Sequence, residues 1–301
     1  MFKNLTVYRI GPDWSASVAD MEERLHKARF VACGLTQQQS SGWVEPRGIK
    51  HAPLVEKVAG HLLLKLMTEQ RVLPGAVIKR RVEEITQKIE QETGRKPGKK
   101  QSKEIKEQAM LELLPMSFTK QASINVWIDP DQRLLLVDSS SQGKADEVVS
   151  YLVKTLESIA VGQLHTKQSA AAAMSEWLVS GEPPSSFTVD RDCELKSSDE
   201  MKSLVRYSRH LLDIDEVRQH ITSGKVPTKL GMSWEGRVSF LLSDTMQVKK
   251  LTFLDVVFEG QKAASKDEAF DADAAIATGE LSQLLPDLID ALGGEQPIGG
   301  V

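Results

Sequence analysis

Long hydrophobic runs are missing from this chain of 301 residues. The longest, Leu62-Leu63-Leu64 and Leu134-Leu135-Leu136-Val137, are far shorter than the roughly 20 residues that a membrane-spanning helix needs. The N-terminus enters a strand-like pattern at once, so we expect no signal peptide. An apolar content of 41% and a charged content of 27% are typical of a soluble globular protein that can bury a substantial core. We therefore expect no membrane as a partner.

Cysteine and cofactor motifs are also scarce. The two cysteines, Cys33 and Cys193, lack metal-type spacing, which favours a reduced, cytosolic location with ordinary thiols. The six histidines are scattered without HxH or HxxxH spacing. The phosphate-binding loop, the GxGxxG pattern and the GxSxG pattern are all absent. We expect no metal or other cofactor.

Aromatic residues make up only 5% of the chain, and its formal net charge is -4. The acidic balance excludes a protein that is coated with positive charge all over. A contact with nucleic acid must therefore come from a localised surface.

Such a surface is present between Lys79 and Lys106, where ten cations stand against five glutamates. A local positive excess on an acidic protein is typical of a surface that faces a polyanion. Because no aromatic residue is interleaved with these cations, contact with the phosphates of a duplex fits better than stacking on a single strand. The ten cations are Lys79, Arg80, Arg81, Lys88, Arg95, Lys96, Lys99, Lys100, Lys103 and Lys106.

Turn residues and apolar periodicity place this basic segment on two helices. Pro74 opens a helix that keeps apolar residues at helical spacing until Gly94, which suits a C-terminal stop. A second helix is predicted from about 102 to 114, before Pro115, so the two form a helical hairpin. The rest of the pattern predicts an α+β fold with mostly antiparallel sheets and flanking helices. The expected strands cover 5–10, 61–67 with 70–73 as a hairpin, 122–129 with 133–138 as another, 187–195, 229–234, 237–242 and 248–254; the expected helical pieces cover 17–28, 144–158, 169–179, 201–212, 213–223 and 281–292.

Two other interpretations of the charged residues stay open. Interleaved Lys and Glu, such as Glu84 with Lys88, are typical of a merely solvated helix face. Asp129, Asp138 and Lys144 superficially resemble a metal-dependent nuclease set, although Asp129-Pro130-Asp131 is also explained as a turn. We expect a protein that is not an enzyme, with a recombination nuclease as the alternative.

Several ordered motifs resemble the bacterial recombination-associated protein RdgC family. They extend over nearly the whole chain, and no single one is as specific as a metal-ligand set. The matching motifs are Phe2-Lys3-Asn4-Leu5-Thr6-Val7-Tyr8-Arg9, Gly42-Trp43-Val44-Glu45-Pro46, Leu113-Leu114-Pro115-Met116-Ser117-Phe118, Trp127-Ile128-Asp129, Glu176-Trp177-Leu178-Val179-Ser180-Gly181, Val226-Pro227-Thr228-Lys229-Leu230, Thr278-Gly279-Glu280-Leu281 and Leu292-Gly293-Gly294-Glu295.

The resemblance implies a crescent-shaped subunit that pairs at both ends into a homodimeric ring around duplex DNA. It implies binding without sequence preference, and restraint of RecA-promoted recombination by occupying the DNA. RecA would then be an indirect partner, in a cytoplasmic, nucleoid-associated protein. The alternative is a module that contacts RecA without DNA contact by the hairpin.

The implied division of the chain is a central domain of 1–73 and 119–180, a helical finger of 74–118, a strand-rich base domain of 181–262, and a C-terminal part of 263–301 that packs on the central domain. Phe118 and Met116 are expected in the dimer interface, although Phe118 could also be a core residue. Members commonly carry a basic residue where this chain has Met116 and Ser117. Beyond the ten cations above, the expected DNA contacts are Lys120, Arg206 and Arg209.

Overall fold

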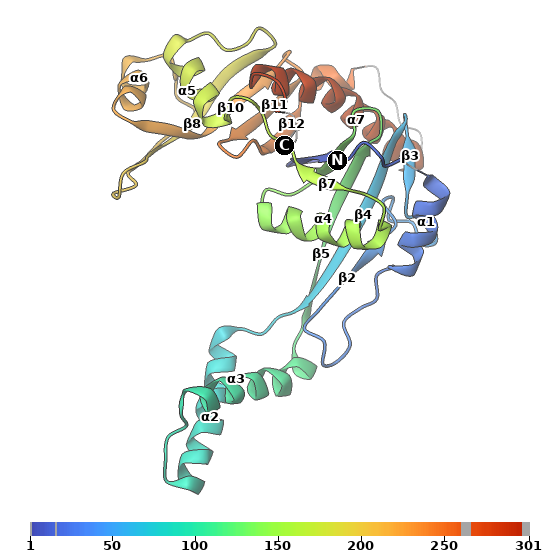
Figure 1. Cartoon of the computed structure of the whole chain (residues 1–301), viewed down its shortest axis with the longest axis vertical. Helices are drawn as coiled ribbons and strands as arrows, with labels where there is room; N and C mark the ends of the chain where they lie inside the picture. The colour runs from blue at the N-terminus through green and yellow to red at the C-terminus, as the bar shows by residue number, and fades with distance from the viewer. Residues whose placement is uncertain (1, 16, 260–265, 297–301) are drawn as a thin grey trace. The chain divides into compact units, whose positions relative to one another are not determined.

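The computed structural model describes residues 2–15, 17–259 and 266–296 (Figure 1). The chain divides into two compact units. The larger contains residues 1–24, 45–64 and 124–301, and the smaller contains residues 25–44 and 65–123. The fold is α+β with antiparallel sheets, as the sequence predicted. None of the helices in these described ranges is both long enough and apolar enough to cross a membrane.

The first sheet has the strand order β2-β4-β5-β6-β1-β7, with β3 paired to β4. Its strands are β1 (Thr6–Ile10), β2 (Gln39–Val44), β3 (Glu56–Val58), β4 (His61–Arg71), β5 (Thr119–Asp129), β6 (Leu134–Val137) and β7 (Val161–Gln163). The predicted hairpin of β5 and β6 is confirmed. Its turn is fixed by the Asp129 carboxylate, which accepts a hydrogen bond from the backbone N–H of Gln132 at 2.9 Å.

Two helices accompany these strands. They are α4 (Gln142–Leu156), in the larger unit, and α1 (Val18–Lys27), whose last three residues belong to the smaller unit. On α4 the apolar side chains Ala145, Val148, Leu152 and Leu156 recur at helical spacing and are all buried. The α4 prediction is therefore confirmed to within two residues at each end.

The predicted hairpin at 61–67 and 70–73 is wrong, because β4 runs unbroken from His61 to Arg71. Thr68 and Glu69 resemble turn residues in the sequence. Glu69 is nevertheless buried, and its carboxylate accepts a hydrogen bond from the backbone N–H of Cys33. Pairing with β2 continues through this stretch, from Gln39 opposite Gln70 to Val44 opposite Lys65.

The second sheet belongs wholly to the larger unit and has the order β12-β11-β10-β8-β9, with every pair antiparallel. The predicted meander at 229–254 is confirmed. The region 201–212 contains a strand instead of the expected helical piece, because residues 204–207 pair with β8. The strands are β8 (Phe187–Ser197), β9 (Leu204–Tyr207), β10 (Lys225–Trp234), β11 (Val238–Ser243) and β12 (Val248–Phe253). The helix α5 (Ala170–Ser180) precedes β8, and α6 (Asp215–Thr222) lies between β9 and β10 in the chain.

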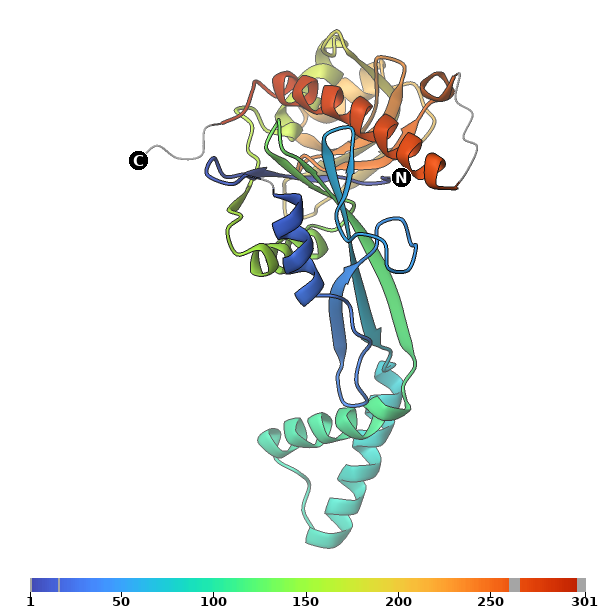
Figure 2. The ribbon, with the colours of Figure 1, turned by 90° about the vertical axis from the view of Figure 1, so that its right-hand side faces the viewer.

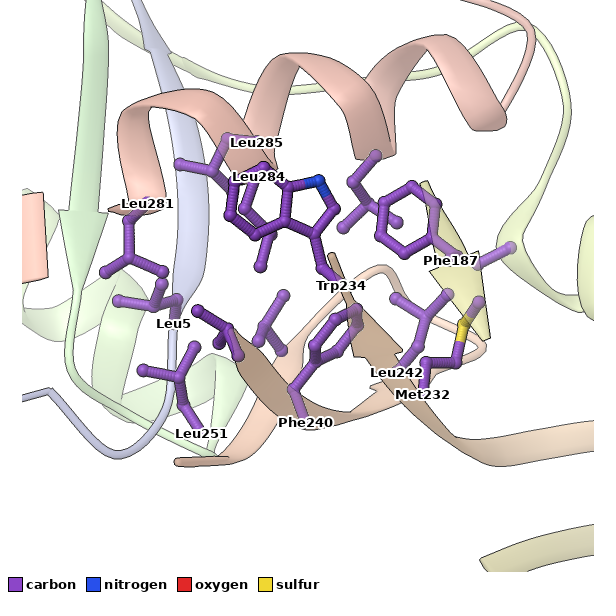
Figure 3. Packing of buried hydrophobic residues seen from close by; sticks show 14 of the residues in the cluster. Leu5, Phe187, Met232, Trp234, Phe240, Leu242, Leu251, Leu281, Leu284 and Leu285 are labelled. Atoms are coloured by element: carbon purple, nitrogen blue, oxygen red, sulfur yellow. The ribbon is translucent and has the colours of Figure 1, made fainter. Parts of the chain in front are cut away.

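The C-terminal helix α7 (Lys266–Ala291) covers one face of this second sheet (Figure 3). Its apolar stripe, which includes Leu281, Leu284 and Leu285, packs with Trp234 and Phe240 in one buried cluster. The indole N–H of Trp234 donates to the Asp287 carboxylate at 2.8 Å. The stripe that the sequence predicted therefore lies in the buried core.

Candidate nucleic-acid interface

The smaller unit carries the predicted helical hairpin, made of α2 (Gly75–Thr93) and α3 (Lys99–Leu113). Gly94 ends α2 in the left-handed conformation, with φ 68°, and its N–H donates to the Glu90 carbonyl as expected of a C-terminal stop. The helix α3 begins at Lys99, three residues earlier than predicted. Figure 2 shows the two helices diverging from the end nearest the strands toward the turn that joins them.

Little apolar surface is buried in this hairpin. The structure shows no buried residue on α2, and on α3 only Ile105 and Ala109 are buried among the helix residues it describes. The helices are also linked by an ion pair of 2.7 Å between Arg81 and Glu112. Because most of the hairpin faces solvent, its side chains are available for contacts with another molecule.

The predicted cations of the hairpin fall into two groups. Those of the first group pair with glutamates on the hairpin itself. Such exposed pairs at i,i+3 or i,i+4 contribute only about 0.3–0.5 kcal/mol each, so they yield readily to a phosphate. The pairs are Lys79–Glu83 at 3.9 Å, Arg80–Glu84 at 3.2 Å, Arg81–Glu84 at 3.0 Å and Lys103–Glu107 at 3.9 Å.

Arg81 is the most strongly held member of this group. Hydrogen bonds to Glu112 and Glu84 raise the pKa of its guanidinium, and the bond from Arg81 lowers the pKa of both carboxylates. Its side chain is also less exposed than that of Arg80, at 41% against 83%. Arg81 therefore serves first to join the two helices.

The second group consists of exposed cations for which the described residues supply no carboxylate within 4.0 Å. Four of them flank the turn between the helices, so the positive charge is densest at the end of the hairpin away from the strands. The group comprises Lys88, Arg95, Lys96, Lys99, Lys100, Lys106 and, on β5, Lys120.

The opposite end of the hairpin presents apolar side chains. Phe118 is 87% exposed and Met116 is 74% exposed. The carbonyl of Phe118 accepts a hydrogen bond from the N–H of Val72 at 2.8 Å, which places Phe118 beside the start of α2. The alternative that Phe118 is a core residue is therefore wrong.

A buried polar network fixes this end of the hairpin, and sequence reasoning missed it. Arg71, only 9% exposed, donates to the carbonyls of Gly34 at 3.1 and 3.2 Å, Leu114 at 3.0 Å and Ser117 at 3.1 Å. On the same face of β4, the Glu69 carboxylate accepts hydrogen bonds from the Cys33 N–H and the Gln121 side chain, which together lower its pKa. The network anchors the segment that connects α3 to β5.

The comparisons with known proteins agree over almost the whole length of the chain. A family model described as "Putative exonuclease, RdgC" matches residues 1–295. The chain belongs to the RdgC family. Proteins named "Recombination-associated protein RdgC" from Dechloromonas aromatica, Bordetella pertussis and Cupriavidus necator are 43%, 41% and 44% identical to it, over 98–99% of this chain and of each relative.

The family description of this RdgC-family chain contains the word exonuclease, and a metal-dependent nuclease needs carboxylates that converge on a divalent metal ion. Asp129 is buried and caps its own turn, as described above. The Asp138 carboxylate accepts hydrogen bonds from the N–H groups of Lys3 at 3.1 Å and Asn4 at 2.9 Å. Within the described ranges there is no group of three or more His, Cys, Asp and Glu side chains that could hold a metal ion. The names of the curated relatives refer to recombination and to no catalysis.

The remaining predicted contacts, Arg206 and Arg209, belong to the larger unit of the RdgC-family chain. Arg206 lies on β9, where its guanidinium Nε donates to the Glu194 carboxylate at 3.1 Å. Arg209 follows the strand with a left-handed φ of 53°, and its N–H donates to Asp192. Both arginines lie within the predicted helical piece at 201–212, which is wrong because residues 204–207 form β9.

Proposed function

We propose that this RdgC-family protein binds duplex DNA without sequence preference, through phosphate contacts made by the helical hairpin. The observation that carries the proposal is the concentration of exposed cations around the turn, at Arg95, Lys96, Lys99 and Lys100, for which the described part of the chain supplies no carboxylate within 4.0 Å. Point charges on flexible side chains neutralise phosphates without reading bases, and each contact releases a counterion.

The wider proposal is a homodimeric ring of crescent-shaped subunits that encircles DNA and limits RecA-promoted recombination by occupying the substrate. The exposed Phe118 and Met116 support it, because apolar side chains of this size at the surface are available for contact with a second copy. In this proposal the protein is cytoplasmic and nucleoid-associated, and it needs no cofactor.

The test is equilibrium binding to a short labelled duplex across a salt series. The variant changes Lys96, Lys99, Lys100 and Lys103 to Gln. The matched control changes four exposed lysines of the larger unit, Lys50, Lys57, Lys144 and Lys154.

Loss of four phosphate contacts lowers the salt slope by about 3.6, so between 50 and 200 mM salt the wild type loses about a hundredfold more affinity than the variant. The control keeps the wild-type slope. If the hairpin variant and the control bind alike, the hairpin is only a solvated face.

Two other functions are separated by parallel measurements. The family description contains the word exonuclease, and a nuclease would release shortened products when labelled DNA is incubated with the protein and Mg²⁺ or Mn²⁺. If the protein acts on RecA alone, the Lys-to-Gln hairpin variant should inhibit RecA-promoted strand exchange as well as the wild type does.

A further inference from the structure

A cavity of about 520 Å³ lies over the second sheet of the larger unit, at a distance in sequence from the helical hairpin. Four cations and two carboxylates line it, so its walls carry an excess of positive charge. The cations are Arg206, Lys229, Lys249 and Lys250, here called the basic cavity residues; the carboxylates are Asp192 and Glu194. Of these four, only Arg206 is a DNA contact predicted from the sequence.

The pairing of the strands explains why two of the cations meet. Arg206 on β9 stands opposite Glu194 on β8, and Glu194 stands opposite Lys229 on β10. Residues directly opposite one another point to the same face of an antiparallel sheet. The adjacent row, with Tyr207, Cys193 and Leu230, is buried in the core, so the row with Glu194 faces the cavity.

Glu194 holds these two cations in place. Its carboxylate accepts hydrogen bonds from the Lys229 ammonium at 2.9 Å, the Thr228 hydroxyl at 2.9 Å and the Arg206 guanidinium at 3.1 Å. Burial raises the pKa of Glu194, but these hydrogen bonds outweigh the effect and bring the pKa to about 2. At neutral pH one fixed negative charge therefore orients two positive charges.

A β-bulge brings in the other two cations. The register of β11 with β12 shifts between the pairs Ser239–Thr252 and Leu241–Lys249, so β12 has one extra residue there. Adjacent residues of a regular strand point to opposite faces, but the bulge allows Lys249 and Lys250 to line the same cavity. Lys250 takes a left-handed φ of 51° at this point.

The lysines of the bulge are the available charges. The described residues provide no carboxylate within 4.0 Å of either ammonium group, whereas Asp192 already accepts hydrogen bonds from the Ser208 hydroxyl and the Arg209 N–H. The single negative charge of Glu194 balances only one of the two positive charges of Arg206 and Lys229. An excess of about two positive charges in a hollow of this size suits a phosphate group.

We infer that the basic cavity residues form a second phosphate-binding site, occupied by the backbone of duplex DNA. The inference rests on the proposed DNA binding and extends it to a surface outside the helical hairpin. Lys249 and Lys250 contact the phosphate, and Glu194 acts as a positioning residue through Lys229 and Arg206.

The experiment compares the wild type with Lys249→Gln/Lys250→Gln and with the charge-matched control Lys50→Gln/Lys57→Gln, by duplex binding across the same salt series. Loss of two contacts lowers the salt slope by about 1.8, so between 50 and 200 mM salt the wild type loses about tenfold more affinity than the bulge variant. The control keeps the wild-type slope. Circular dichroism and thermal melting of each variant confirm that the fold is retained.

A calorimetric titration with inorganic pyrophosphate identifies the source of the phosphate. The expected result is duplex binding that depends on Lys249 and Lys250, with no measurable pyrophosphate binding. A different result would overturn both the DNA source and the proposed function. In that result the wild type binds pyrophosphate but no duplex, and the bulge variant, Lys249→Gln/Lys250→Gln, no longer binds pyrophosphate. If the hairpin variant loses duplex affinity while the bulge variant matches its control, the second site is refuted and the proposed function stands.

Discussion

Arg71 offers the sharpest test of how the helical hairpin is held. Its guanidinium makes four hydrogen bonds to three backbone carbonyls, which belong to Gly34, Leu114 and Ser117. In Arg71→Met the Leu114 carbonyl keeps its hydrogen bonds from the N–H and the hydroxyl of Ser117, at 3.1 and 2.7 Å, but it loses the buried bond from the charged guanidinium. Water can replace only the partly exposed bonds. A hydrogen bond to a charged group contributes about 1.5–3 kcal/mol, and the variant loses one buried bond of this kind together with part of the other three, so we expect a loss of about 3 kcal/mol in local stability.

The assay is native-state hydrogen exchange, because a loss of local stability speeds the opening of this region without unfolding the whole chain. A loss of about 3 kcal/mol increases exchange about a hundredfold. The reporting amides are those of Val72, Leu114 and Ser117, whose hydrogen bonds lie beside Arg71. The amide of Leu292, bonded to the Leu288 carbonyl in the larger unit, serves as an internal reference.

Arg80→Met is the matched control, because the Arg80 side chain is 83% exposed and pairs only with the exposed Glu84 in the described ranges. Its effect should stay within about 0.5 kcal/mol. Equal exchange in the Arg71 and Arg80 variants would refute the argument that Arg71 anchors the hairpin.

Three further predictions concern other parts of the molecule. A Cβ atom at Gly42 would lie 2.3 Å from the Phe30 Cα, so Gly42→Ala should destabilise the smaller unit by about 3 kcal/mol in hydrogen exchange, whereas Gly143→Ala, with open space around it, should not. In the proposed dimer, Phe118→Ser should open the contact at the hairpin while the other end still pairs, which lowers the sedimentation coefficient. The unfolding free energy of the subunit should change by less than about 0.5 kcal/mol, because the Phe118 side chain is 87% exposed. The pKa of Glu194 is about 2, below its ordinary 4.5, so its carboxylate stabilises the fold above about pH 4.5 and this contribution is lost as the pH falls toward 2. In Glu194→Gln the loss of stability between pH 4.5 and 2, followed by circular dichroism, should therefore be smaller than in the wild type.

Each of these predictions has an outcome that contradicts it. Equal protection in the Gly42 and Gly143 variants would mean that the Phe30 backbone moves aside at little cost. An unchanged sedimentation coefficient for Phe118→Ser would remove Phe118 from the dimer interface. Acid unfolding curves of identical shape for the wild type and Glu194→Gln would show that the ion pairs of Glu194 do not stabilise the second sheet.

Local sequence patterns predicted the helices and most of the strands well. Pro74 and Gly94 defined α2 because each imposes a backbone conformation that depends on few neighbours. The hairpin of β5 and β6 was found for the same reason, since Asp129 caps a turn within three residues. The cations of the helical hairpin were recognised because they are close together in the sequence.

Features that depend on strand register were missed. Arg206, Glu194 and Lys229 form one row only because three strands align them across 35 residues of sequence, and their local surroundings suggested a helical piece near Arg206. The bulge at Lys250 is likewise a property of the pair of strands and not of β12 alone. The sequence pattern predicts a turn at Glu69 because the partners that keep it in a strand, Cys33 and Gln121, are distant in the sequence.

The hydrogen bond between the Val72 N–H and the Phe118 carbonyl has a consequence for engineering this fold. It brings together the two points at which the chain leaves β4 and enters β5, which are neighbouring strands of one sheet. The 45 residues from 73 to 117 thus form a cassette inserted at a strand-to-strand crossover. A two-residue β-turn can close the same gap, so the cassette can be removed or exchanged between relatives while the pairing of the flanking strands is kept.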